Sequence, residues 1–247
     1  NWKGGGTGSS NTDGSITSTV SANTTAGFSV VKYTGAGGNS TVGHGLGVKP
    51  KIIIIKRLDS ANGWIMYNEV LGHSKYMILN TTAAEASNST FFNATSPTSS
   101  VFTVGNDAGV NGGSNTYVAY CFAEKIGFSR FGHYKGNASS DGVFVYTGFK
   151  PSWLMIKRTN SSENWHIFDI KRNPQYPTSS SYGGMATRLM ANLNNSTDLS
   201  QGGFEFLSNG LKMTTNWAGG NGSGDTFIYM CFGQSLVGSN NIPCTAR

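Results

Sequence analysis

Two stretches of the chain carry the same order of apolar and polar positions. Each begins with a proline, continues through a short apolar run and ends in Lys-Arg: Pro50 to Arg57 and Pro151 to Arg158. Such a run is too short for a helix and is typical of a strand buried on both faces. A polar loop follows each run and leads into an aromatic segment, Trp64 to Tyr67 and Trp165 to Phe168. Both stretches therefore predict the same β-hairpin.

The repeat extends beyond the hairpin. Gly27-Phe28-Ser29 returns as Gly127-Phe128-Ser129, and the apolar segment around Cys121 returns around Cys231. We therefore predict an all-β chain built by tandem duplication of a β-sandwich unit, of jelly-roll or concanavalin-like type. The expected parts are a linker or extended arm (1–26), two sandwich repeats (27–126 and 127–233) and a C-terminal tail (234–247).

Composition supports many strands and turns and excludes some partners. Lys and Arg number 18, Asp and Glu 12, and there are 34 glycines. The net charge is +6, but the basic residues are scattered at strand ends, so we expect no nucleic-acid partner. No apolar run approaches the roughly 18–20 residues of a membrane helix, so no membrane insertion is expected. Cys121 and Cys231 are expected to be buried free thiols, and with Cys244 alone near the end the pattern indicates a reducing compartment.

Residues suited to catalysis or metal binding are not clustered in the sequence. The acidic residues are isolated or lie in predicted loops, without the facing pair of a glycosidase. Known catalytic motifs are missing, so we expect no enzyme activity and no cofactor. The loops at 106–107 and 221–225 offer oxygen ligands for calcium but lack a suitably spaced glutamate. Plain polar turns are the favoured interpretation, and no metal site is expected.

Several stretches resemble a known group of proteins. They are Gly-His-Gly-Leu-Gly-Val-Lys-Pro-Lys (43–51), Thr-Tyr-Val-Ala-Tyr-Cys-Phe-Ala-Glu (116–124), Asn-Thr-Asp-Gly-Ser-Ile-Thr-Ser-Thr-Val-Ser-Ala-Asn (11–23) and the closing Ile-Pro-Cys-Thr-Ala-Arg. The chain resembles the C-terminal regions of tail fibre and tail-spike-like proteins of bacteriophages, especially marine and environmental ones. The resemblance implies display on a virion, assembly in the host cytoplasm, contact with other tail subunits and a homotrimer. It transfers no catalytic or binding residues.

Glycan binding is the chemistry that the sequence favours. Sugar rings stack on exposed aromatic side chains while amides and carboxylates bind the hydroxyls. The tryptophans in repeated strands are expected in the core, whereas two loops that depart from the repeat, 171–185 and 216–225, place aromatic residues among Asn, Ser and Gly. We expect a binding site in the second copy, formed by Tyr176, Tyr182, Asn216, Trp217 and Asp225. An interface with a neighbouring subunit explains these aromatics equally well, and the glycine loop around His44 is the alternative location.

Three functions remain open from the sequence. The first is a module at the end of a phage tail appendage that recognises a host-surface glycan. The second is a purely structural fibre or decoration domain of the virion. The third, less favoured, is a depolymerase of surface polysaccharide.

Overall fold

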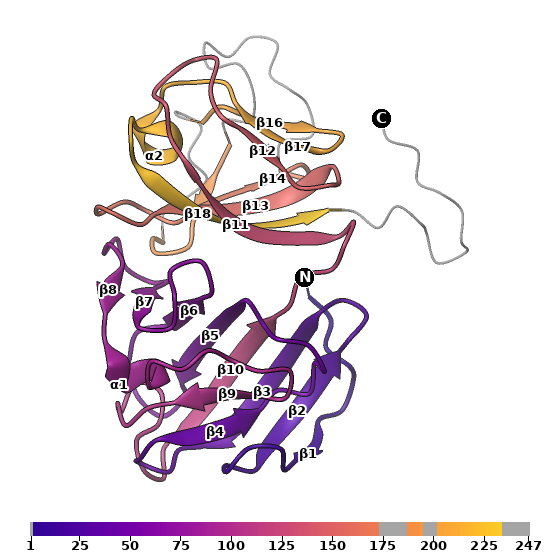
Figure 1. Cartoon of the computed structure of the whole chain (residues 1–247), viewed down its shortest axis with the longest axis vertical. Coiled ribbons are helices and arrows are strands. Elements are labelled where there is room, and N and C mark those ends of the chain that lie inside the picture. Colours follow the sequence, from indigo (N-terminus) through magenta and orange to yellow (C-terminus); the bar gives the residue numbers. More distant parts are fainter. Residues whose placement is uncertain (1, 173–186, 195–201, 234–247) are drawn as a thin grey trace, which may run out of the picture. The chain divides into compact units, whose positions relative to one another are not determined.

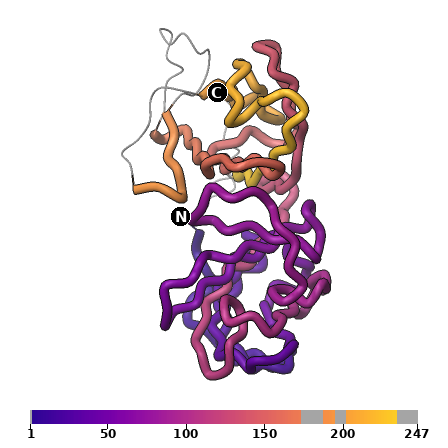
Figure 2. Tube along the Cα trace, turned by 90° about the vertical axis from the view of Figure 1, so that its left-hand side faces the viewer, coloured from indigo at the N-terminus to yellow at the C-terminus, as the bar shows by residue number. Residues whose placement is uncertain are grey.

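The computed structural model describes residues 2–172, 187–194 and 202–233. As predicted, the structure is all-β: within these ranges antiparallel sheets dominate, with two single-turn helices (Figure 1). The chain divides into two compact units, unit 1 (Asn1–Lys125) and unit 2 (Ile126–Arg247). Each unit is formed by one half of the chain, which can be followed by colour along the trace (Figure 2). No helix in the described ranges is long and apolar enough to cross a membrane.

Unit 1 consists of an eight-stranded sheet and a two-stranded sheet. The large sheet has the order β1-β2-β3-β10-β5-β6-β7-β8. Its strands are β1 (Ser9–Asn11), β2 (Ser18–Asn23), β3 (Phe28–Thr34), β5 (Ile52–Arg57), β6 (Ile65–Asn68), β7 (Lys75–Ile78), β8 (Ala86–Ser87) and β10 (Thr116–Phe122). The small sheet pairs β4 (Ser40–Gly43) with β9 (Val101–Val104), and the short helix α1 (Ser89–Phe92) precedes β9. Val42 and Phe102 of the small sheet share one core with Val31, Ile53 and Ile55 of the large sheet, so the unit is a β-sandwich.

Unit 2 is built in the same way from a five-stranded and a three-stranded sheet. The larger sheet has the order β11-β18-β13-β14-β15, and the smaller has the order β12-β17-β16. The elements are β11 (Ser129–Lys135), β12 (Phe144–Tyr146), β13 (Pro151–Arg158), β14 (His166–Asp169), β15 (Leu189–Met190), β16 (Phe204–Leu207), β17 (Gly210–Met213), α2 (Ala218–Asn221) and β18 (Thr226–Gly233). Figure 1 shows β12, β16 and β17 over β13, β14 and β18. Val145, Phe206 and Leu211 of the smaller sheet meet Leu154 and Phe168 in the core between the two layers.

The central strands of the two units occupy matching positions. β5 lies between β10 and β6, and β13 lies between β18 and β14. The register also matches, because Cys121 lies opposite Ile53 in unit 1 and Cys231 lies opposite Leu154 in unit 2. A tandem duplication would produce this common order and register. The duplication itself stays a prediction.

The N-terminal segment is part of the unit 1 sandwich. Residues expected to be a linker or extended arm instead contribute β1 and β2 to the large sheet. Between these strands, Ile16 makes a bridge to Val42 of the small sheet and is buried in the core. The segment therefore links both layers along one side of the unit. The spacing of Ile16 and Val20, two apolar residues in a polar stretch, was the signal that the linker interpretation missed.

The central strands bury apolar side chains on both faces, as their sequences predicted. Ile53 and Ile55 face the core between the sheets, while Ile52 and Ile54 are buried on the opposite face. Cys121 and Cys231 are buried free thiols within these sheets. Burial raises the pKa of Cys121 to about 12 and also raises that of Cys231, so both thiols stay protonated and unreactive near neutral pH.

A buried asparagine ties the two layers of each unit together. Asn111 accepts a hydrogen bond from the backbone N–H of Ala36, and its amide donates to the carbonyls of Gly38 and Gly105. Asn221 makes the same three bonds in unit 2, accepting from Asn137 N–H and donating to the carbonyls of Ser139 and Thr215. Neither side chain is exposed. Each amide binds three backbone groups inside the protein, where a backbone group without a hydrogen bond is costly.

We predict that Asn111→Ala and Asn221→Ala each lower the free energy of unfolding by about 2–4 kcal/mol, because each leaves buried backbone groups without a partner. Chemical denaturation followed by tryptophan fluorescence measures the change. Asn39→Ala is the control, since its amide bonds only to the exposed Asn93 side chain. A loss at Asn111 or Asn221 no larger than that of the control would contradict the structural role of the buried amides.

Candidate functional site

One corner of unit 2 departs from the pattern of unit 1. Matching strand pairs place His166 opposite Ile156 where unit 1 has Ile65 opposite Ile55. Ile65 belongs to the apolar core of unit 1, and the ring of Phe91 from α1 packs beside it near Gly109. A buried histidine therefore stands in unit 2 at a position that unit 1 fills with an aliphatic side chain.

The corner of unit 2 contains a hollow of about 540 Å³. Three segments form it: the loop from β13 to β14 with the first residue of β14, the residue before β15, and the loop from β17 to β18. Its lining mixes amides, ionisable groups, one aromatic ring and small residues: Glu163, Asn164, His166, Arg188, Asn216, Trp217, Ala218 and Gly219. This volume lies within the roughly 300–1,000 Å³ of small-ligand sites.

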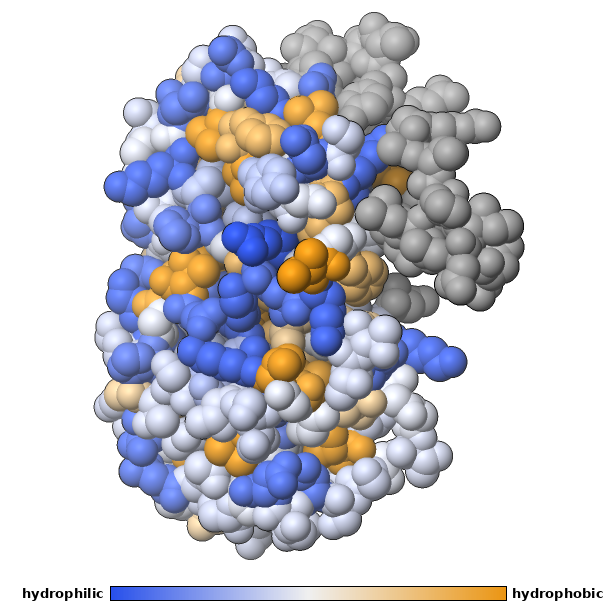
Figure 3. Space-filling view, turned by 45° about the vertical axis from the view of Figure 1, so that its right-hand side comes forward, coloured by the Kyte–Doolittle hydropathy of each residue, from blue (hydrophilic) through white to orange (hydrophobic). Residues whose placement is uncertain are grey.

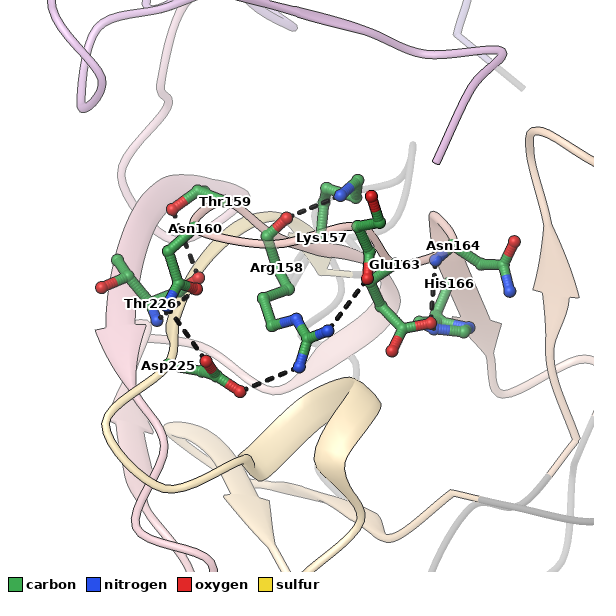
Figure 4. A network of polar contacts seen from close by, with 10 residues as sticks. Lys157, Arg158, Thr159, Asn160, Glu163, Asn164, His166, Asp225 and Thr226 are labelled. Atoms are coloured by element: carbon green, nitrogen blue, oxygen red, sulfur yellow. Dashed lines mark hydrogen bonds and ion pairs between the residues drawn. The ribbon is translucent and has the colours of Figure 1, made fainter. Parts of the chain in front are cut away.

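Glu163 and His166 form a polar pair at the wall of the hollow. His166 Nε2 lies 3.3 Å from Glu163 Oε1, which also accepts the backbone N–H of Asn164 at 2.8 Å (Figure 4). These bonds lower the pKa of Glu163 to about 2, so it is ionised at neutral pH. Burial lowers the pKa of His166, which favours the neutral ring, and the contact of Nε2 with the Glu163 carboxylate favours the tautomer that carries its proton on Nε2. The second ring nitrogen, Nδ1, is a buried acceptor with no hydrogen-bond partner among the described residues.

Trp217 is the aromatic part of the lining. The guanidinium carbon of Arg188 lies 4.6 Å from the centre of its ring, and the ring of His166 meets it edge-on at 4.7 Å. The indole also lies so close to Gly219 and Gly220 that a Cβ at either position would collide with it. A ligand that approaches from the Arg188 side would therefore contact the guanidinium instead of the indole. Because the glycines also pack against the ring, only part of the indole is accessible to a ligand.

A second polar network lies beside the hollow. Arg158 pairs with Asp225 at 3.0 Å, and Asn160 donates to the other oxygen of Asp225 (Figure 4). In unit 1 the matching Arg57 pairs instead with Asp59, which stands at the position of Asn160. The equivalent arginines of the two units are thus paired with carboxylates from different loops. Because both units pair this arginine, we infer a structural role for Asp225.

Lys157 is buried next to this network. Its Nζ donates to the carbonyl of Arg158 at 2.6 Å, as Lys56 donates to Arg57 in unit 1. Burial lowers the pKa of Lys157 to about 8, although the nearby carboxylate of Glu163 opposes the shift. Lys157 does not line the hollow and affects it only through its charge.

The predicted site residues fall into three groups. Asn216 and Trp217 line the hollow. Asp225 does not line it and is engaged by Arg158 and Asn160. Tyr176 and Tyr182 lie outside the described residues. At the alternative location, the glycine loop around His44, the His44 ring itself is fully buried, with Nδ1 accepting from Leu46 N–H and Nε2 lying 3.3 Å from the Thr98 carbonyl, while Val48 of the same loop is exposed.

Sequence reasoning missed Glu163, His166 and Arg188. The signal for the first two was available in the repeat, where Glu163 replaces Asn62 and His166 replaces Ile65. No comparable signal identified Arg188, which follows the expanded loop. In the part of the chain that the structure describes, no cluster of three His, Cys, Asp or Glu side chains could hold a metal ion.

We predict that the charge of Glu163 stabilises the folded state in a pH-dependent way. Its pKa falls from the ordinary 4.5 to about 2, so the contribution is complete above pH 4.5 and is lost as the pH falls towards 2. Denaturation of the native protein and of Glu163→Gln at several pH values tests this. The stability difference should be largest near neutral pH and shrink below pH 4.5, and a constant difference across that range would contradict it.

Comparison with known proteins identifies one family. No curated protein and no solved structure matches the chain. The model of a domain of unknown function, DUF7483, matches residues 1–235, almost the whole length. The chain therefore belongs to the DUF7483 family.

Proposed function

We propose that the chain is a module of a bacteriophage tail appendage and that the hollow of unit 2 binds a glycan of the host cell surface. The observation that carries the glycan part is the polar hollow at His166 and Trp217, where the matching corner of unit 1 is packed with Ile65 and Phe91. Replacing apolar packing by buried polar groups costs stability. Ligand binding gives a reason for accepting that cost in one unit only.

The lining suits a ligand rich in hydroxyl groups. Glu163 supplies an ionised acceptor, and the side-chain amides of Asn164 and Asn216 can both donate and accept. The edge of the Trp217 indole adds an apolar surface for the C–H groups of a sugar ring. A hydroxyl group needs both donors and acceptors, and this corner provides both within one hollow.

Binding fits the hollow better than glycan hydrolysis. Glycosidases place two carboxylates across the scissile bond. Among the described lining residues, Glu163 is the single carboxylate, and Asp225 is engaged with Arg158 outside the lining. We therefore propose recognition without cleavage.

The virion context is carried by the resemblance of the sequence to tail fibre and tail-spike-like proteins. Under this proposal the chain is assembled in the host cytoplasm, joins other tail subunits and forms a homotrimer. The face in Figure 3 shows small patches of apolar side chains separated by polar ones. Under this proposal such a surface contacts other tail subunits or other copies of the chain. A purely structural role in the virion is the competing function.

Adsorption of the labelled full chain to a panel of bacterial strains tests the proposal. We predict that Asn216→Ala and Glu163→Gln each weaken adsorption about tenfold, equivalent to ~1.4 kcal/mol. The first variant removes an amide from the site, and the second removes the negative charge and replaces one acceptor oxygen by a donor. Asp59→Asn in unit 1 is the matched control and should adsorb normally, since the Asp59 carboxylate contacts the Arg57 side chain and the Thr116 N–H, both of which belong to unit 1.

Stripping the surface glycan from a bound strain should abolish adsorption of the native chain. Adsorption that survives this treatment, or that is unchanged in both unit 2 variants, would contradict glycan binding in the hollow. A chain that adsorbs to none of the strains would favour the purely structural role.

A further inference from the structure

The outer face of the three-stranded sheet in unit 2 carries a group of exposed apolar side chains. Strand β12 alternates, with Val145 in the core and Phe144 and Tyr146 on the outer face, 45% and 64% exposed. Gly210 of β17 pairs with Tyr146 on one side and with Leu207 of β16, which is 37% exposed, on the other. Two aromatic rings and one leucine therefore share a single sheet face.

Glycines beside the two rings hold them close to the backbone. A Cβ added to Gly210 would lie 2.7 Å from the ring of Phe144, so this ring lies over the strand where β17 has no side chain. The ring of Tyr146 lies at ordinary van der Waals distance from Gly148, 3.6–3.8 Å from a Cβ placed there, and Gly148 has φ +82, a conformation that favours glycine. Rings supported in this way lose little freedom when a ligand stacks on them.

Charged groups surround the rings. Lys212 is paired with Phe144 across the sheet on one side and with Glu205 on the other. Lys212 also forms an ion pair with Asp141, whose side chain is almost fully exposed. The aromatic face therefore has a positive group and two carboxylates within the same small sheet region.

Unit 1 has no counterpart of this face. With the offset that relates Pro50 to Pro151, Phe144 and Tyr146 stand at the positions that Gly43 and Gly45 occupy in unit 1. A Cβ added to Gly43 would collide with the Asn11 side chain of the N-terminal segment. Ser15 exchanges hydrogen bonds with Thr41, so the N-terminal segment also covers this edge. The exposed aromatic rings therefore arose at positions that the sandwich itself does not require to be aromatic.

The size of the face decides what it can bind. Three strands spaced by ~4.8 Å, with three or four residues at ~3.3 Å each, span roughly 10 Å by 10 Å. A standard protein interface needs about 800 Å² on each partner and excludes charged residues from its centre. This face is much smaller and includes Lys212 beside Phe144 and Tyr146, so a second copy of the chain does not fit it. A flat ligand with one or two rings of its own fits the face.

We propose that Phe144 and Tyr146 form a second saccharide-binding surface, separate from the hollow and independent of the function proposed for it. Pyranose C–H groups stack on the two rings, and Asp141, Glu205 and Lys212 bind the hydroxyls. Side chains two residues apart on one strand are ~7 Å apart, so neighbouring sugars of one chain can contact the two rings in turn. A surface open on all sides accepts internal sugars of a long polysaccharide as well as its ends.

The test is binding of the full chain to an array of bacterial surface polysaccharides. We expect Tyr146→Ala and Phe144→Ala each to weaken binding to at least one bound polysaccharide about tenfold. Tyr146→Phe keeps the ring and should retain most of the binding. Leu58→Ala, which removes an exposed apolar side chain of unit 1, is the matched control and should change nothing.

Two results would overturn this inference. One is that no polysaccharide on the array is bound, and the other is that binding is unchanged in both alanine variants. If Asn216→Ala alone removes all binding, the hollow is the site and the sheet face is not. Light scattering on the same proteins tests whether the face binds a second copy of the chain instead. An oligomer that dissociates on Tyr146→Ala would show that it does.

Discussion

The register of the central strand pair is the constraint on which each unit depends. β10 with β5, and β18 with β13, bury apolar side chains on both faces, and a slip of one residue would exchange the two faces. The outer strands and loops are then built on this pair. The buried amides of Asn111 and Asn221 lie before β10 and β18, and they bind the loops that follow β3 and β11 in the large sheets and β9 and β17 in the small sheets. A common central register with a common amide link leaves the peripheral loops free to differ between the units.

The differences between the units lie in such peripheral positions. His166 begins a strand, Glu163 and Trp217 lie in or next to loops, and Phe144 and Tyr146 face outward from a short edge strand. Unit 1 has Ile65 at the position of His166 and Asn62 at the position of Glu163. Buried polar groups in the corner of unit 2, among them Lys157 and His166, are costly and have pKa values shifted by burial. The replacement of Ile65 by the buried His166 at matching strand positions is the main structural argument for the proposal that unit 2 binds a ligand.

The sequence was sufficient to predict the all-β class and the hairpin with its buried central strand, because the pattern of Pro50 to Arg57 is local and recurs at Pro151. It also placed Asn216 and Trp217 in a loop that departs from the repeat. It could not show that this loop lies against Glu163 and His166, about fifty residues earlier, since that contact depends on the packing of two layers. The aromatic face was missed for a different reason: Phe144 and Tyr146 alternate with Val145 as in any strand, and only the core contacts of Val145 show which side is exposed.

The most direct measurement follows the indole N–H signals of the five tryptophans by NMR. The full chain would be titrated with a polysaccharide fragment from a strain to which it adsorbs. We predict that the Trp217 signal shifts with ligand concentration while the signal of Trp64, in the matching hairpin of unit 1, stays in place. Saturating ligand that leaves Trp217 unshifted, or that shifts only Trp64, would contradict a binding site in the hollow of unit 2.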